Sequence, residues 1–532
     1  MKRTSCGSRG KLAMAAAVGA WALATSIAGA TALDDIGVNQ LRAIDPTLTG
    51  TGVSVAQVEA TNYSNPNDPT GTAPYDPQYD ANNFEIDPAI FTASPMPVIT
   101  YVGKQGTSPT TVYDPSLRSA HATTVATNFV GTTTGAAPGV PAVVNYNANF
   151  FFNNVIATNA NIQTPLAAAN APAVKVVNQS FIFGDTNPAD IAANDQAYDD
   201  YVATHGTIIV SAVGNGGGPQ SPATAYNSIA VGAYGGTSSV GPTPDGRSKP
   251  DITAPESLTS FSTPYVSGIA AVMVQAGNLG RGGPGTQGDS VDPRTVKALL
   301  LNGAVKPADW AHTPAQPLDP RYGSGIVNAL NSYQNLVAGE KAASAITAVP
   351  LNAPYAVPAS GSPVGPAGWN LGTLTTTATT DAAAHYLFDF STPNGTYSLT
   401  STLTWDRAAG VSGINNLDLF LYNEDTSTLA NLTSAQSISA VDNVEQLDIS
   451  GLAPGHYDLE VLKHGGIAGS DPNVASDDET YALAFTTSVT QGTPETSGIM
   501  ALGFVAAGML LRRRSTATAS RAVKVRADQA IV

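Results

Sequence analysis

The spacing of apolar residues changes once along this chain, and the change predicts two different folds within one sequence. Between about residues 40 and 335, short and almost continuously apolar runs alternate with helical runs rich in small residues. Strands that are apolar on both faces and separated by helices are typical of a parallel sheet covered on both sides. We therefore predict an α/β domain here. Its strand-like runs are 53–58, 174–177, 207–210 and 229–232, and its helical runs are 121–130, 189–204, 262–276 and 293–303.

After about residue 345 the helical pattern ends. Pro, Gly, Ser and Thr dominate residues 345–380, a composition that is typical of a linker. Alternation of apolar and polar residues between regularly spaced turns then predicts antiparallel strands. We expect a smaller all-β sandwich of about 110 residues in this half. The alternating segments are 386–390, 417–421, 444–449, 457–461 and 481–485.

The charge and the cysteine content exclude several functional classes. The 532 residues include 24 Lys and Arg against 40 Asp and Glu, a net charge of -16. Residues 1–32 and 496–532 hold ten of the basic residues and one acidic residue, which leaves 14 basic and 39 acidic residues in 33–495. Such an acidic body argues against binding to nucleic acid, which needs Lys and Arg on the phosphates. Cys6 is the only cysteine, so the chain has no intrachain disulfide, cysteine-based zinc site or catalytic thiol.

Both ends of the chain are predicted to be targeting segments. Residues 1–32 combine a basic start, an apolar alanine-rich stretch from Leu12 to Ile27, and small residues at 28–32. This is the pattern of a secretory signal that signal peptidase removes. Near the other end, the apolar stretch 499–511 precedes three arginines at 512–514. As a helix this stretch would span about 20 Å, which is less than the roughly 30 Å of a hydrocarbon core.

Residues 493–515 resemble the PEP-CTERM sorting signal, in which a Pro-Glu-Pro tripeptide precedes an apolar stretch and a basic cluster. The tripeptide here reads Pro-Glu-Thr over 494–496, and a basic tail, 516–532, follows the arginines. The resemblance implies processing by an exosortase, membrane contact through this segment, and an extracellular or cell-envelope location. A plain C-terminal membrane anchor is the alternative.

Eight short segments occur in the order that is typical of one peptidase family. One reads Thr-Ser-Phe-Ser-Thr-Pro-Tyr-Val-Ser-Gly over 259–268 and is similar to that family's Thr-Ser-Met-Ala-Thr-Pro-His-Val-Ala-Gly. Another, His-Ala-Thr-Thr-Val-Ala over 121–126, is similar to its His-Gly-Thr-His-Val-Ala. On these segments the first half resembles the subtilisin-like serine peptidases. The eight segments are 50–59, 121–126, 135–139, 177–180, 211–216, 239–255, 259–268 and 322–329.

The resemblance implies a three-layer fold, with a parallel sheet flanked by helices, and hydrolysis of peptide bonds in protein or peptide substrates. It makes Ser260 the nucleophile, His121 the general base and Glu59 the acid that orients the base. Asn215 and the backbone N–H of Ser260 are implied as the oxyanion hole. Ser180 lies in the segment that lines the substrate cleft in the family.

Two departures from the family pattern support a second hypothesis. Glu59 stands where the family has Asp and is one methylene longer. Leu258 replaces a glycine before the nucleophile, where glycine would allow an unusual φ. The alternative is therefore a catalytically inactive subtilisin-like scaffold that acts as an envelope binding or structural protein. A Glu59 oxygen within about 3 Å of a His121 nitrogen would favour the peptidase.

No cofactor is expected to be required. The family resemblance implies structural calcium, but no Asp-x-Asp-x-Asp-Gly loop is present, so we assign no metal ligands. His385, His456 and His464 have no ligand spacing and are expected to be structural or at the surface. The predicted organisation is a signal peptide over 1–32, a peptidase domain over 40–338, a linker over 339–380, a sandwich over 381–490, a sorting or anchor segment over 493–515, and a basic tail over 516–532.

Overall fold

The computed structural model describes seven stretches of the chain, all within residues 1–491, which form one compact unit. The sorting segment, the basic tail and all but the last two residues of the signal peptide lie outside the described residues. None of the helices in the described stretches is long and apolar enough to cross a membrane. The described residues are 31–60, 84–104, 108–166, 171–351, 361–431, 433–465 and 478–491.

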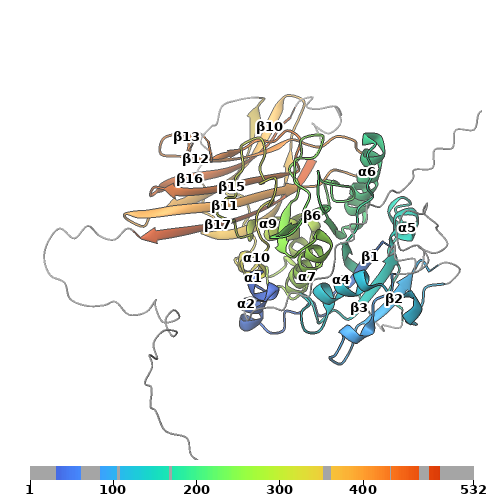
Figure 1. Ribbon diagram of the computed structural model, residues 1–532. Coiled ribbons are helices and arrows are strands. Elements are labelled where there is room, and N and C mark those ends of the chain that lie inside the picture. The colour runs from blue at the N-terminus through green and yellow to red at the C-terminus, as the bar shows by residue number, and fades with distance from the viewer. Residues whose placement is uncertain are drawn as a thin grey trace, which may run out of the picture. The chain divides into compact units, whose positions relative to one another are not determined.

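A seven-stranded sheet forms the first half of the chain, and all of its neighbouring pairs are parallel, as predicted (Figure 1). The strand order is β2-β3-β1-β4-β5-β6-β7. The chain therefore starts inside the sheet with β1, forms the edge strand β2, and returns with β3 between them. It then adds β4 to β7 in order on the other side of β1. The strands are β1 Ser54–Glu59, β2 Val98–Val102, β3 Ala142–Asn147, β4 Val174–Gln179, β5 Ile208–Ala212, β6 Ile229–Tyr234 and β7 Ile252–Pro255.

Helices cover both faces of this sheet. Successive residues of a strand point to opposite faces, so each strand contributes side chains to the clusters on both sides. Val55 and Val176 pack in one buried cluster with α4 and α7, whereas Ala56 and Val177 pack in another with α5 and α6. The helices are α1 Ala32–Asp35, α2 Val38–Ile44, α4 Ala120–Val130, α5 Ala148–Phe151, α6 Pro188–His205, α7 Thr259–Asn278, α8 Gln287–Ser290, α9 Pro293–Asn302 and α10 Ala329–Val337, with 3-10 turns η1 Pro88–Ile90 and η2 Pro115–Leu117 and a π-helical turn η3 Phe152–Ile156.

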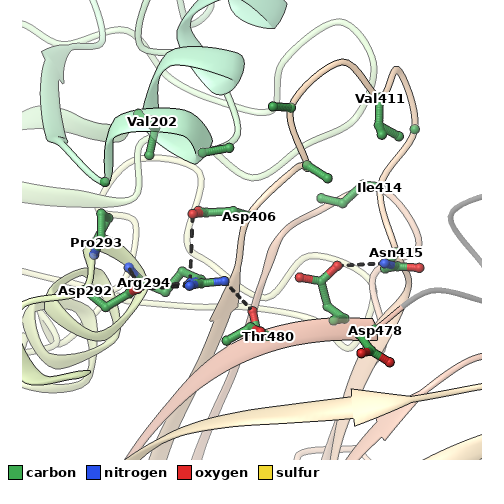
Figure 2. Close-up of a pocket in the computed structure, with 16 residues that line it drawn as sticks. Val202, Asp292, Pro293, Arg294, Asp406, Val411, Ile414, Asn415, Asp478 and Thr480 are labelled. Carbon is green, nitrogen blue, oxygen red and sulfur yellow. Dashed lines mark hydrogen bonds and ion pairs between the residues drawn. The ribbon is translucent and has the colours of Figure 1, made fainter. Parts of the chain in front are cut away.

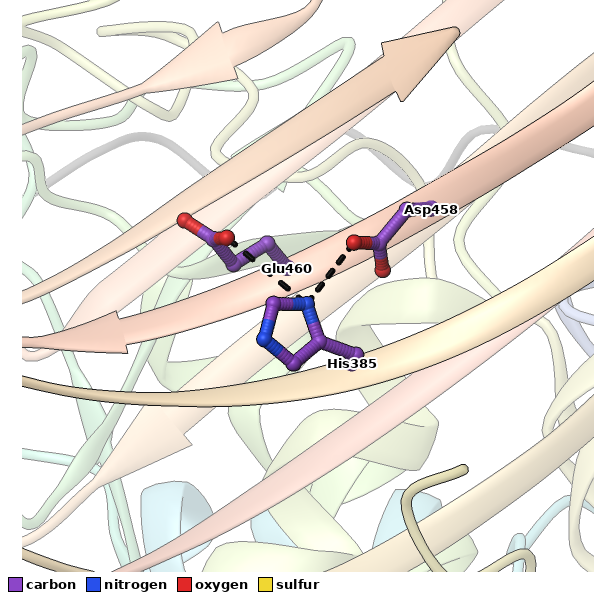
Figure 3. A group of neighbouring side chains, drawn as sticks. All are labelled: His385, Asp458 and Glu460. Carbon is purple, nitrogen blue, oxygen red and sulfur yellow. Dashed lines mark hydrogen bonds and ion pairs between the residues drawn. The ribbon is translucent and has the colours of Figure 1, made fainter. Parts of the chain in front are cut away.

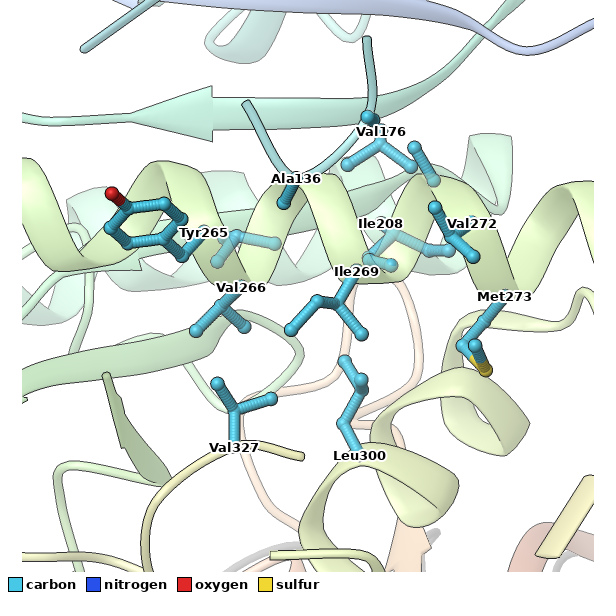
Figure 4. Packing of buried hydrophobic residues seen from close by; sticks show 14 of the residues in the cluster. Ala136, Val176, Ile208, Tyr265, Val266, Ile269, Val272, Met273, Leu300 and Val327 are labelled. Carbon is cyan, nitrogen blue, oxygen red and sulfur yellow. The ribbon is translucent and has the colours of Figure 1, made fainter. Parts of the chain in front are cut away.

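Helix α7 is the centre of the larger cluster. Figure 4 shows Val266, Ile269 and Val272 on this helix among side chains from the sheet and from the neighbouring helices. Nearly all of α7 is buried from its first residue onward. A helix that is buried on every side has little freedom to shift, so the residues at its N-terminus are held in a fixed position.

Two antiparallel sheets form the second half of the chain, and they enclose a separate apolar cluster that includes Tyr386, Trp405 and Leu459. This confirms the predicted antiparallel fold. One sheet has the order β15-β11-β17-β9, and the other has β13-β12-β16-β10-β8 with β14 beside β12. The strands are β8 Ala345–Pro350, β9 Ala367–Thr375, β10 Thr380–Phe390, β11 Gly395–Trp405, β12 Leu417–Asn423, β13 Thr428–Leu429, β14 Gln436–Ser437, β15 Val444–Leu452, β16 Gly455–Lys463 and β17 Asp478–Gln491.

Strands β8 and β9 lie within residues 339–380, where the sequence predicted only a linker. The prediction is wrong for these two stretches. β8 alternates between half-buried and exposed residues at the edge of its sheet, and β9 contains two glycines and two threonines. These small and polar residues obscure the alternation of apolar and polar residues by which strands are predicted. β8 forms by pairing with β10, and β9 forms by pairing with β17.

The sandwich is joined to the peptidase half by buried contacts. Arg407, just after β11, places Nη2 2.6 Å from Asp199 Oδ2 on α6, and its guanidinium lies over the ring of Tyr226. Its backbone N–H donates to the Asn227 side chain, which donates back to its carbonyl. Trp369 of β9 is fully buried in the apolar cluster of the first half. The two halves therefore share a core.

A cavity of about 360 Å³ lies where α6 and α9 meet the sandwich (Figure 2). Arg294 donates to the Thr480 carbonyl at 3.2 Å, and Asn415 donates to Glu479 at 2.7 Å. Burial raises the pKa of Asp406 and of Glu479 to about 7. None of the residues that we predicted for catalysis lines this cavity.

The contact between Arg407 and Asp199 predicts a large effect on stability. Arg407→Met should lower the free energy of unfolding by about 3–5 kcal/mol, because it leaves the buried Asp199 carboxylate without its cation. Urea denaturation of the whole chain measures this loss. Arg321→Met is the control, since it removes an exposed ion pair with Asp309 and should cost far less. Equal losses in the two variants would contradict a shared core held by Arg407.

The acidic cavity predicts that stability falls as the pH rises from about 5 to 8. The folded pKa values of Asp406 and Glu479, about 7, exceed the values near 4 expected for the unfolded chain. In this window the folded protein keeps protons that the unfolded chain has lost, so raising the pH favours unfolding. Thermal melts should show a declining midpoint, with a shallower decline in Asp406→Asn. Parallel profiles for the two proteins would show that Asp406 does not titrate as described.

Candidate active site

The predicted catalytic residues gather at the carboxyl ends of the strands around β1. The strand order reverses beside β1, and in open α/β sheets the crevice for ligands lies at such a point. Glu59 ends β1, and Ser180 follows β4. His121 is the second residue of α4, and Ser260 is the second residue of α7. Two strand ends and two helix starts thus supply the site.

Glu59 and His121 are in direct contact. Glu59 Oε2 lies 2.8 Å from His121 Nδ1, and Gln57 Nε2 donates to Glu59 Oε1 at 3.1 Å. Glu59 is fully buried, whereas the His121 side chain is 30% exposed. β1 pairs regularly with β3 through Glu59 itself. The longer glutamate therefore reaches the imidazole without a shift of the strand, and the distance meets the condition that favours the peptidase.

The electrostatics of this pair favour a proton on the imidazole. Burial opposes the charge on His121, but the Glu59 carboxylate outweighs burial and raises the pKa of His121 above its ordinary value of 6.5. A carboxylate on Nδ1 also fixes the tautomer of the neutral ring, because it accepts the Nδ1 proton. The lone pair of the neutral ring is then on Nε2.

Ser260 is at the start of α7, and the residue that follows it contacts this imidazole. The ring of Phe261, the next residue, lies 5.5 Å from the His121 ring between centroids. Within the described residues, the structure gives no hydrogen bond between the Ser260 hydroxyl and the His121 ring. Such contacts often tighten only when substrate binds. The N-terminal position also places the positive end of the helix dipole at Ser260.

Asn215 is held with its amide oxygen turned toward α7. Its Oδ1 accepts hydrogen bonds from the backbone N–H and from the hydroxyl of Thr259, both at 2.9 Å. Its Nδ2 has no acceptor among the described residues. Asn215 is exposed, so this N–H group is available beside the residue that precedes Ser260.

Ser180 lies in the interior, where only 3% of the residue is exposed. Its hydroxyl donates to the Ser260 carbonyl at 2.8 Å and accepts from Asn178 at 3.0 Å. Ser267, also on α7, donates to the same asparagine. This chain of bonds ties β4 to α7 and positions the backbone of Ser260. A role of Ser180 in substrate binding stays a prediction.

Leu258 is compatible with the turn before Ser260. It is the N-cap residue of α7, with φ -137° and ψ 151°. This is extended backbone that any L-residue adopts. The leucine therefore introduces no backbone strain where the family has glycine.

Sequence reasoning missed the residues that hold the site together, which are Gln57, Asn178, Thr259 and Ser267. Gln57 could have been found, because residues two apart on a strand share a face and Glu59 follows it at that spacing. The other three act through hydrogen bonds between distant segments, for which the sequence carries no local signal. An imidazole oriented by a carboxylate is one part of the arrangement that activates a serine nucleophile, and Ser260 is the candidate for the other part.

Comparison with known proteins gives a peptidase family match that includes His121, Ser180, Asn215 and Ser260 and begins after Glu59. Residues 75–325 match the model of the subtilase family. Among solved structures, the prenylagaramide maturation protease PagA is 20% identical with a TM-score of 0.34, and the match covers 56% of this chain and 98% of that chain. The self-cleaved protease domain of PatA is 22% identical with a TM-score of 0.33, over 55% and 99%. A protease from Pseudoalteromonas arctica is 18% identical with a TM-score of 0.35, over 57% and 95%.

The contact between Glu59 and His121 predicts a pKa change that can be measured without any substrate. Glu59→Gln should lower the pKa of His121, because a neutral amide no longer stabilises the imidazolium. NMR titration of histidines labelled in the ring measures this pKa. As the control, Asp425→Asn should lower the pKa of His456, its exposed partner, and leave that of His121 unchanged. A His121 pKa that does not fall in Glu59→Gln would contradict the contact.

Proposed function

Since residues 75–325 belong to the subtilase family, we propose that this chain is a serine endopeptidase that hydrolyses peptide bonds in proteins or peptides. The observation that carries the proposal is the 2.8 Å contact between Glu59 and His121. The His121 ring also contacts Phe261, which follows Ser260 at the start of a buried helix. The contact between Glu59 and His121 supports the proposal that Glu59 orients the imidazole, although its side chain is one methylene longer than that of aspartate.

In the proposed reaction, Ser260 Oγ attacks the carbonyl carbon of the scissile peptide bond, and its proton passes to His121 Nε2. Glu59 holds the other ring nitrogen and stabilises the imidazolium that forms. The oxygen of the tetrahedral intermediate accepts hydrogen bonds from the Ser260 backbone N–H and from Asn215 Nδ2. His121 then gives its proton to the leaving amine. Water, activated by the same base, releases the acyl group from Ser260.

We also propose that the protein is exported to the cell envelope or the exterior. The basic, apolar and small-residue pattern of residues 1–32 and the sorting-like pattern of 493–515 support this. Signal peptidase and an exosortase would be the processing partners, and the C-terminal segment would make the membrane contact. Structural calcium is compatible with this setting, but the proposed chemistry uses only side chains of the chain itself.

The proposed activity predicts that a fluorophosphonate probe labels the purified protein and that casein is cleaved. Both signals should be lost in Ser260→Ala, because the probe and the substrate need the same activated hydroxyl. Labelling is read on a gel and cleavage by release of soluble peptides. Absence of labelling in a folded wild-type sample would contradict the proposal and favour the inactive scaffold.

Two further variants in the same assay separate the roles of the neighbouring groups. Asn215→Ala should lower kcat by about 10²–10³-fold, because one donor to the oxyanion is lost. Glu59→Gln should lower kcat by about 10⁴-fold, because the imidazole loses the acid that orients it. An unchanged kcat in Asn215→Ala would remove this residue from the proposed oxyanion hole and leave the nucleophile assignment intact.

A further inference from the structure

A histidine and two carboxylates meet on the sandwich, well apart in sequence from the catalytic residues. His385 on β10 lies directly opposite Glu460 on β16, and Asp458 is two residues from Glu460 on the same face. Figure 3 shows the imidazole between the two carboxylates. His385 Nδ1 lies 2.7 Å from Asp458 Oδ2 and 3.7 Å from Glu460 Oε2. One donor atom from each of the three residues lies within 4.8 Å of the others.

The group is buried and carries more negative than positive charge. His385 is 1%, Asp458 0% and Glu460 5% exposed. Even a protonated His385 would balance only one of the two carboxylates, and a third acid, Glu424, is close enough to act on the same imidazole. Buried charges are costly unless they are paired or bind a metal ion. Among the described residues, His385 is the one cation that the structure pairs with Glu460.

The imidazole is fixed with Nδ1 toward the carboxylates. Thr347 Oγ1 on β8 lies 2.9 Å from His385 Nε2, so the threonine can accept the Nε2 proton. A hydrogen bond on the second ring nitrogen is typical of histidines that bind metals, because it sets the tautomer and the ring orientation. Three adjacent strands, β8, β10 and β16, thus hold the donors and their support.

We propose that His385, Asp458 and Glu460 form a structural site for a divalent metal ion of the zinc type. Zinc binds one imidazole nitrogen and two carboxylate oxygens at about 2.0–2.2 Å, which places tetrahedral donors about 3.3 Å apart. The two separations that involve His385 Nδ1, 2.7 and 3.7 Å, bracket this value, and the three donor atoms all lie within 4.8 Å of one another. Calcium prefers six to eight oxygen donors, so a set that includes an imidazole favours zinc.

Binding replaces one proton by the metal ion. In the metal-free protein, the proton shared between His385 and Asp458 holds the pair together. On binding, the imidazole keeps its Nε2 proton for Thr347, presents the Nδ1 lone pair to the ion, and releases the shared proton to solvent. The ion would then link β10 to β16 through side chains. Because all three residues are buried, we expect the ion to enter while the sandwich folds.

The whole chain, refolded with zinc and passed through gel filtration, is expected to retain about one zinc ion per molecule by elemental analysis. His385→Gln and Glu460→Gln should each lower the content at least tenfold. His456→Gln is the matched control, because His456 is an exposed histidine with a single carboxylate partner, Asp425. It should retain the zinc. Cobalt in place of zinc should give visible absorption bands that are lost in Glu460→Gln.

Several outcomes would overturn the proposal. These are a wild-type protein that is folded but free of zinc, equal zinc contents in wild type and Glu460→Gln, or loss of zinc in His456→Gln. Glu460→Gln keeps the volume of the side chain, and circular dichroism checks that the variant folds. A chelator should lower the thermal midpoint of the wild type but not that of Glu460→Gln. None of these readouts depends on peptidase activity, so the site can fail or hold independently of the proposed function.

Discussion

The buried carboxylate of Glu59 is the constraint around which the candidate site is arranged. A charge with no exposure at the end of a central strand must be met by donors, and Gln57 and His121 supply them. The imidazole therefore lies at the end of β1, and its ring contacts Phe261 in the first turn of α7. Helix α7 is held by the sheet and the surrounding helices. The nucleophile candidate, Ser260, is thus placed by the packing of a whole helix together with the hydrogen bond that its carbonyl accepts from Ser180.

The sandwich contributes to the same rigidity. Residues from β9, β15 and β17 complete the apolar cluster that contains α7. The segment that leads into β7 is bound by the sandwich too, since the Ser248 backbone N–H donates to Asp442 at 2.6 Å. An accessory domain joined by a free linker could be lost without effect on the first half. Here its removal would expose part of the core on which the helix rests, so the two halves are one structural unit.

Much of the fold could be predicted from the sequence, and the misses have physical causes. The runs that became β1, β4, β5 and β6 are mostly buried and rich in Val, Ile and Ala, which made them recognisable as strands. β3 was missed because it buries asparagine. The Nδ2 group of Asn145 donates to the Phe84 carbonyl, a contact that no local pattern reveals. In the site, the resemblance named the residues, but the orientation of the Asn215 amide depends on Thr259, 44 positions away. Whether Leu258 strains the turn before Ser260 could be decided only from its backbone angles, which the sequence does not give.

A histidine paired with a buried carboxylate occurs twice in the chain, as His121 with Glu59 and as His385 with Asp458. The surroundings of the second ring nitrogen, Nε2, differ between the two pairs. In both, an imidazole Nδ1 contacts a buried carboxylate at 2.7 or 2.8 Å. The His121 side chain is 30% exposed, and no hydrogen bond to its second nitrogen is found among the described residues, which suits the proton transfer proposed for it. The second nitrogen of His385 is held by Thr347, and a further carboxylate approaches the first. A ring bound on both sides and sealed from solvent cannot shuttle protons. It can, however, hold an ion in place, because its lone pair, its orientation and the surrounding negative charge are all fixed by paired strands.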